Sequence, residues 1–176
     1  MTEEIVPKKK RVASKAKGNA GERAICKILS TELAPLKFIR SPGSGAYVGG
    51  KNVKNLHLYS QETMLVFVSD ICCSNEDDVG KKFRFVVESK SYKTMEKWEL
   101  LFNGKSQIYR WLAQVKMDAS KVSKEPILIF KYNGSKHYVA VDKNVELPVE
   151  SVLLLPTGDK LCLLSELLKF KDFWVL

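Results

Sequence analysis

The segment from Lys82 to Lys90 alternates apolar and polar side chains, the pattern of a β-strand whose two faces meet different surroundings. One face carries Phe83, Phe85 and Val87, and the other carries Arg84, Val86, Glu88 and Lys90. Glu88 and Lys90 therefore project from the same face, about 6.8 Å apart along the strand. This pattern predicts a sheet with a carboxylate and an amine together near the end of one strand.

Two interpretations of Glu88 and Lys90 remain open from this segment alone. A strand end that emerges into water would leave them as a surface ion pair, and such pairs are common and weak. Alternatively, the carboxylate and the amine act together on a ligand. A further acidic residue, Asp70, favours the second interpretation.

Asp70 interrupts the apolar run from Met64 to Cys73, which is typical of a buried strand. Burial of a lone carboxylate is unfavourable unless a metal ion or another cation compensates it. If the acidic turn from Asn75 to Gly80 joins two strands as a hairpin, Asp70 and Glu88 come close together. A divalent metal ion would then remove their repulsion, and Mg²⁺ commonly takes one or two carboxylates while keeping several waters. The alternative is that Asp70 is an ordinary turn or strand-end residue.

The first helix is expected from about Asn19 to Leu33, with Asn19 as its N-cap. Glu22 lies three residues after Asn19 and shares the helix face that carries Ile25 and Leu29. Its carboxylate is therefore either a capping group at the helix N-terminus or a third acid directed at a shared site.

The remaining periodicity predicts further strands and helices. The expected strands are 36–40, 126–132, 137–141 and 152–155, and the expected helices are 104–122 and 163–170. Asn133-Gly134 is a strong turn signal between two of these strands. The order of elements predicts an α/β fold with a central mixed β-sheet flanked by helices.

The chain has 176 residues and a net charge of +9. This length fits one domain, 18–176. The charge suggests a polyanionic partner such as nucleic acid, and a solvated basic surface that binds nothing specific is an equal alternative on charge alone. Residues 1–17 are expected to form a flexible basic arm, whose cluster is Lys8, Lys9, Lys10 and Arg11. No apolar run is long enough to predict a membrane span.

Several segments together resemble a known family. They are GERAICKIL with Glu22, FIRSPGSGA, VSDICC with Asp70, FVVESKSY with Glu88 and Lys90, SQIYRWL with Gln107, and PILIFKY with HYVAV. Their order and spacing resemble the PD-(D/E)XK nuclease superfamily, and within it the archaeal-type Holliday-junction resolvases and related small phage nucleases. The resemblance covers residues 18–142. Ser69 stands where those enzymes usually have proline, and the stretch 46–64 is longer than a minimal resolvase needs.

The resemblance implies a restriction-endonuclease-like core and a set of site residues. Asp70 and Glu88 would hold Mg²⁺, for which Mn²⁺ would substitute, together with a backbone carbonyl near Ser89. Lys90 would orient the attacking water or stabilise the developing charge, and Glu22 would complete the metal shell. The residues expected to contact nucleic acid are Arg40, Ser44, Lys93 and Gln107, with Lys8, Lys9, Lys10 and Arg11 of the arm.

The expected function is Mg²⁺-dependent endonucleolytic cleavage of DNA, of branched or structured DNA in particular. A homodimer is expected, because a junction presents two symmetric strands. The expected location is the cytoplasm of a bacterial, archaeal or phage-infected cell, with PKKKRV as a weak nuclear-import match. The alternatives are a non-catalytic nucleic-acid-binding protein that retains the fold and an adaptor whose arm binds a protein. Among the tryptophans, Trp98 and Trp174 are candidates to stack on bases, whereas Trp111 lies on an apolar helix stripe.

Overall fold

The computed structural model describes residues 14–42 and 60–176. The helices are α1 (Ser14–Glu32), α2 (Gln61–Val68), α3 (Glu76–Val79), α4 (Trp98–Phe102), α5 (Gln107–Ala119), α6 (Leu164–Leu167) and the 3-10 helix η2 (Lys171–Trp174). The strands are β1 (Phe38–Arg40), β2 (Ile71–Cys73), β3 (Phe85–Tyr92), β4 (Glu125–Tyr132), β5 (Tyr138–Val141), β6 (Leu153–Leu154) and β7 (Lys160–Leu163). None of the described helices is long and apolar enough to cross a membrane.

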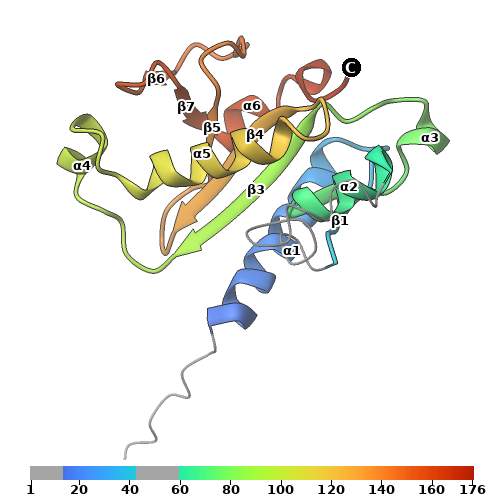
Figure 1. Cartoon of the computed structure of the whole chain (residues 1–176), viewed down its shortest axis with the longest axis horizontal. Coiled ribbons are helices and arrows are strands. Elements are labelled where there is room, and N and C mark those ends of the chain that lie inside the picture. Colours follow the sequence, from blue (N-terminus) through green and yellow to red (C-terminus); the bar gives the residue numbers. More distant parts are fainter. Residues whose placement is uncertain (1–13, 43–59) are drawn as a thin grey trace, which may run out of the picture.

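The strands form one seven-stranded sheet in the order β1-β2-β3-β4-β5-β7-β6. The pair β3–β4 is parallel, and the other neighbouring pairs are antiparallel. Helices cover both faces of this sheet (Figure 1). The expected α/β fold with a mixed sheet flanked by helices, of the restriction-endonuclease-like type, is confirmed.

The alternation of β3 separates two hydrophobic cores, as the sequence predicts. Phe83, Phe85 and Val87 pack with α1, α6 and η2 on one face of the sheet. Val86 packs on the other face against α5, whose buried residues are Ile108, Trp111, Leu112, Val115 and Ala119. These five are the residues that the helical periodicity assigned to its inner face. Glu88, two residues after Val86, projects into the α5 side of the sheet.

The apolar run that we expected as one strand, Met64 to Cys73, is instead a helix followed by a strand. Ser60 caps α2 by accepting a hydrogen bond from the Thr63 N–H, and the helix continues to Val68. Met64 and Val68 are one helical turn apart and both contribute to the core beside α5. A short continuous apolar run fits a buried helix as well as a strand, so the sequence did not separate the two. Asp70 therefore lies between α2 and β2.

Helix α1 begins at Ser14, so Asn19 lies inside the helix and is not its N-cap. Residues 14–17, which we assigned to the basic arm, belong to the first turns of α1, and residues 1–13 lie outside the described part.

In the tail, the expected strand 152–155 is β6 and the expected helix 163–170 shortens to α6. The sequence did not predict α3, α4, β7 or η2. These elements are only four or five residues long, too short to show a clear periodicity.

The C-terminal residues close the beginning of β3. Trp174 is fully buried and its ring stacks on Phe83 at 6.3 Å between centroids. The backbone N–H of Arg84 donates to the Trp174 carbonyl at 3.0 Å, and Val175 forms an isolated bridge with Phe83. The tail is thus part of the core that supports β3.

Replacement of Trp174 by alanine should lower the free energy of unfolding by about 3–5 kcal/mol, because it leaves a large cavity between Phe83 and Phe85. Chemical denaturation monitored by circular dichroism measures this loss. Phe102→Ala, at a side chain that is 63% exposed, is the matched control and should change stability by less than about 0.5 kcal/mol. Equal effects of the two substitutions would contradict the role given to the tail.

Candidate active site

Ser69 fixes the turn that presents Asp70. The Ser69 hydroxyl accepts a hydrogen bond from the Val87 N–H at 2.9 Å and donates to the Ile71 carbonyl at 2.6 Å. The Asp70 N–H donates to the Val87 carbonyl at 2.8 Å. Ser69 is buried, so these bonds form away from water and hold the turn firmly against β3. A serine thus occupies the position usual for proline and ties the turn to the neighbouring strand through its hydroxyl.

The Asp70 carboxylate reaches β3 between Glu88 and Lys90. Its Oδ2 accepts a hydrogen bond from the backbone N–H of Ser89 at 2.9 Å. This contact follows from the antiparallel pairing of β2 with β3, in which Ile71 lies opposite Val87. The expected approach of Asp70 to Glu88 is confirmed.

Glu88 and Lys90 form an ion pair on the α5 side of β3, through Oε1 and Nζ. Glu88 is only 3% exposed, so the interpretation of a surface ion pair is wrong. Burial, and then the nearby negative charge of Asp70, raise the pKa of Glu88 to about 7, although Lys90 opposes the shift. Burial disfavours the ammonium form of Lys90, but the attraction and hydrogen bond of Glu88, together with the charge of Asp70, outweigh burial and raise the Lys90 pKa.

Glu22 does not join Asp70 and Glu88. Its carboxylate forms an ion pair with the Nε of Arg40 on β1. Helix α1 packs on the face of the sheet that carries Phe85 and Val87, whereas Glu88 projects from the opposite face. Over the described ranges 14–42 and 60–176, no three acidic, histidine or cysteine side chains gather closely enough to hold a metal ion. The structure therefore does not place Glu22 in the expected three-acid cluster.

Gly21 allows α1 to approach the same strand closely. A Cβ added at Gly21 would lie 3.2 Å from the Cβ of Ser91, the residue after Lys90. Such a contact is tighter than most real Cβ contacts, so the bare glycine sets how near α1 comes to β3. Sequence reasoning assigned no role to Gly21 or to the Ser69 hydroxyl. The small residue beside Glu22 and the serine before Asp70 were the available signals.

The other expected contact residues are dispersed. Gln107 begins α5, where its backbone N–H donates to the Glu96 carboxylate. Lys93 is exposed just after β3. Ser44 and the basic residues of the arm lie outside the described residues.

The sequence matches the model of a known protein family. The model of the family described as "Phage putative PDDEXK endonuclease" matches residues 13–152, which is most of the chain. The chain belongs to this family. The matched range contains Asp70, Glu88 and Lys90. No curated protein matches the chain, and no solved structure does. The PDDEXK family membership confirms the resemblance at the level of the superfamily and identifies a nuclease fold.

The raised pKa of Glu88 predicts a pH dependence of stability in a PDDEXK protein kept free of metal. A carboxyl group whose folded-state pKa lies above its unfolded value contributes most to stability below about pH 4.5, and this contribution is lost as the pH rises through about 7. Glu88→Gln removes the ionisation. The free energy of unfolding of the Glu88→Gln variant should therefore increase relative to that of the parent as the pH rises from about 5 to about 8.

Urea denaturation in EDTA at several pH values measures this difference. Glu99→Gln, at an exposed position of α4, is the matched control for the loss of one carboxyl group. A difference between Glu88→Gln and the parent that stays constant with pH would show that Glu88 is not held in a desolvating site.

Proposed function

We propose that this protein is a divalent-metal-dependent endonuclease that hydrolyses DNA phosphodiester bonds, with Asp70, Glu88 and Lys90 as its reacting groups. One observation supports the proposal most directly. A carboxylate, Glu88, is buried in the sheet beside a second acid and a lysine, in a chain that belongs to a nuclease family. A buried acid with an acidic neighbour is unfavourable for folding, and a bound cation would relieve it.

The residues present fit a small oxygen-preferring cation. Asp70 uses Oδ2 for the Ser89 N–H, and Glu88 uses Oε1 for Lys90, so one oxygen of each carboxylate remains for a metal ion. Mg²⁺ is commonly held by one or two carboxylates and otherwise keeps its waters, so a third acid is not required. We propose Mg²⁺, with Mn²⁺ as a substitute, and the backbone carbonyl near Ser89 as a further ligand.

Each residue then has a distinct role. The bound cation would supply the Lewis acidity that polarises the scissile phosphate. Lys90 is part-exposed beside Glu88, where its ammonium group is placed to hold a phosphate oxygen and to stabilise negative charge as it develops. The Ser89 N–H orients Asp70, and Ser69 keeps that turn in place. In this proposal Glu22 is not a metal ligand, because its carboxylate binds Arg40 on β1.

As substrate we propose branched or structured DNA, on the basis of the resemblance to Holliday-junction resolvases, and a homodimer as the acting form. The net charge of +9 supports a polyanionic substrate. Cleavage of labelled junctions, flaps and duplexes side by side tests the substrate class, and sedimentation of the protein with and without a junction tests the dimer.

Divalent metal ions should switch the activity on. Mg²⁺ or Mn²⁺ should support DNA cleavage, whereas Ca²⁺ should support binding without turnover, because it is larger and coordinates less strictly. Gel analysis of end-labelled DNA with each ion, beside an EDTA control, measures this. Efficient cleavage in excess EDTA would exclude the proposed chemistry.

Substitutions should separate catalysis from binding. Asp70→Asn and Glu88→Gln should each lower single-turnover cleavage at least about a thousandfold. Their DNA affinity without metal should stay equal or rise slightly, because each removes a charge that repels phosphate. Lys90→Met should also abolish turnover but should weaken binding a few-fold, since it removes a cation.

The opposite signs of the binding changes exclude misfolding as their common cause. Glu99→Gln and Lys81→Met, both at exposed positions, are matched controls that should cleave like the parent. A folded Glu88→Gln protein that cuts DNA at nearly the parent rate would refute the assignment of the site.

A further inference from the structure

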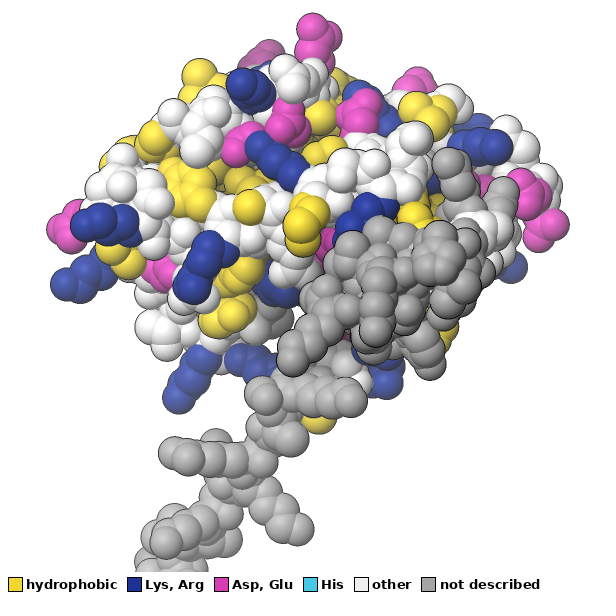
Figure 2. Space-filling view, in the orientation of Figure 1, with side chains coloured by type: hydrophobic (Ala, Val, Ile, Leu, Met, Phe, Trp, Pro, Cys, Tyr) yellow, Lys and Arg dark blue, Asp and Glu magenta, His cyan; other side chains and the backbone are white. Residues whose placement is uncertain are grey.

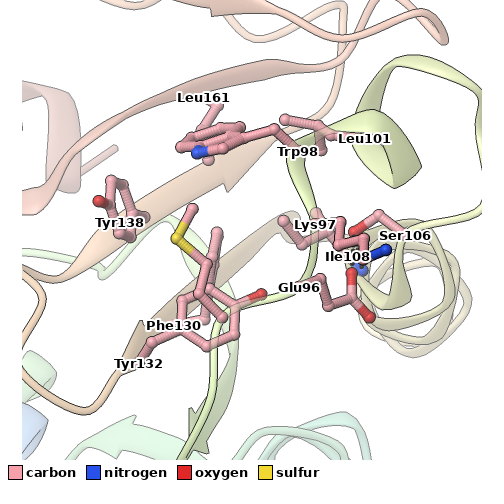
Figure 3. A pocket seen from close by; sticks show the side chains of 11 residues that line it. Glu96, Lys97, Trp98, Leu101, Ser106, Ile108, Phe130, Tyr132, Tyr138 and Leu161 are labelled. Carbon is pink, nitrogen blue, oxygen red and sulfur yellow. Dashed lines mark hydrogen bonds between the residues drawn. The ribbon is translucent and has the colours of Figure 1, made fainter.

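A recess lined mainly by apolar and aromatic side chains lies between α4 and the sheet, apart from the acidic pair. Its lining includes Met95, Trp98, Phe130, Tyr132, Tyr138 and Leu161. Figure 2 shows hydrophobic side chains gathered in the area between α4 and β6. Figure 3 shows these residues around the recess, with Trp98 and Tyr138 near one another and Glu96 across from them.

Trp98 forms a wall of the recess that is open to solvent. It lies at the start of α4 and is 50% exposed, whereas Trp111 and Trp174 are buried. Exposure of half an indole ring is unfavourable in water and is not required by the core of either sheet face. The exposed ring is therefore available for stacking with a ligand.

The recess also holds an unused polar group. Tyr132 is only 4% exposed, yet its hydroxyl makes no hydrogen bond to any of the residues that the structure describes. Figure 3 shows this hydroxyl directed toward Glu96. The hydroxyl oxygen keeps some contact with solvent, so it is free to form a hydrogen bond with a ligand.

Glu96 is held rigidly at the edge of the recess. Its carboxylate accepts hydrogen bonds from the Ser106 hydroxyl at 2.6 Å and from the Gln107 N–H at 3.0 and 3.1 Å. Carboxylate oxygens have further lone pairs, so Glu96 can accept another donor from the recess. The recess therefore offers aromatic faces together with a carboxylate acceptor and a free hydroxyl.

The recess and the acidic pair lie on the same face of the sheet. Phe130 on β4 is paired in register with Lys90 on β3, and Trp111 lies between the Tyr92 ring at 4.9 Å and the Phe130 ring at 6.0 Å. From β3 to β5, where Tyr138 lies, the distance is about 10 Å, since neighbouring strands are about 4.8 Å apart. About three stacked nucleotides of one DNA strand span that distance.

We propose that the solvent-open side of this recess, at Trp98, binds one unpaired nucleobase of the DNA strand. The base would stack on Trp98, and its amino group would donate to Glu96 and the Tyr132 hydroxyl. Lys97, which also lines the recess, is placed to hold the adjoining phosphate. The inference rests on the proposed nuclease function, because the shared sheet face and the basic chain favour DNA over a methylated ammonium ligand, which aromatic cages also bind.

Binding in EDTA tests the recess without relying on cleavage. Fluorescence anisotropy of the full chain should show that Trp98→Ala weakens affinity for a single-stranded oligonucleotide about tenfold and leaves affinity for a blunt duplex within about twofold. Phe102→Ala, on the same helix but outside the recess, is the matched control and should change neither affinity. Thermal melting verifies that each variant is folded.

Tyr132→Phe tests the polar contact with the ring retained. It should weaken binding of oligo-dA and oligo-dC about threefold to tenfold and should leave oligo-dT unchanged, because thymine has no exocyclic amine. Equal single-strand affinity of the Trp98→Ala and Phe102→Ala variants would overturn the proposal. So would quenching of Trp98 fluorescence by tetramethylammonium but not by deoxyadenosine monophosphate. A chain that binds single strands through Trp98 but cuts no DNA with any metal would refute only the nuclease function.

Discussion

The burial of Glu88 is the constraint on which the site depends. Val86, Val87 and Leu128 around it are fully buried, so the sheet that carries the carboxylate also removes it from water. Lys90 and the raised pKa compensate only part of this penalty, and the acidic neighbour Asp70 adds to it. The arrangement is poor for stability alone and well suited to a cation. The Ser69 and Ser89 hydrogen bonds then serve to keep two mutually repelling acids in place.

The parts of the fold that the sequence predicted are those with a repeated pattern. The alternation of β3 and the stripe of α5 each extend over enough residues to define a face, and the Asn133-Gly134 turn fixed the hairpin. The approach of Asp70 to Glu88 followed from the hairpin expected before β3. Two predictions were wrong because they depended on tertiary contacts. The apolar run from Met64 was expected as a strand, because a short buried helix such as α2 has no clear periodicity. Glu22 was expected beside Asp70 and Glu88, but it binds Arg40 because α1 packs on the opposite face from Glu88.

Among the strands that the structure describes, the one parallel pair links the acidic pair to the aromatic recess. Because β3 and β4 are parallel, the chain must cross back over the sheet between them, and α4 and α5 form that crossover. The crossover covers the face that carries Glu88, placing Trp111 between Tyr92 and Phe130 and Trp98 beside Tyr138 (Figure 3). One connection thus supplies both the cover of the site and the wall of the recess.

The close approach of Gly21 to Ser91 makes these two positions a single steric unit. A side-chain carbon gained at position 21 would stand 3.2 Å from the Ser91 Cβ, so helix and strand would have to move apart by a few tenths of an ångström unless a carbon is lost at position 91. An uncompensated change would press α1 slightly away from the strand. Such a movement would carry Glu22 away from Arg40 and would loosen the outer strand that pairs with β2. A larger residue at position 21 is therefore tolerated best together with a smaller residue at position 91, although neither position touches the acidic pair.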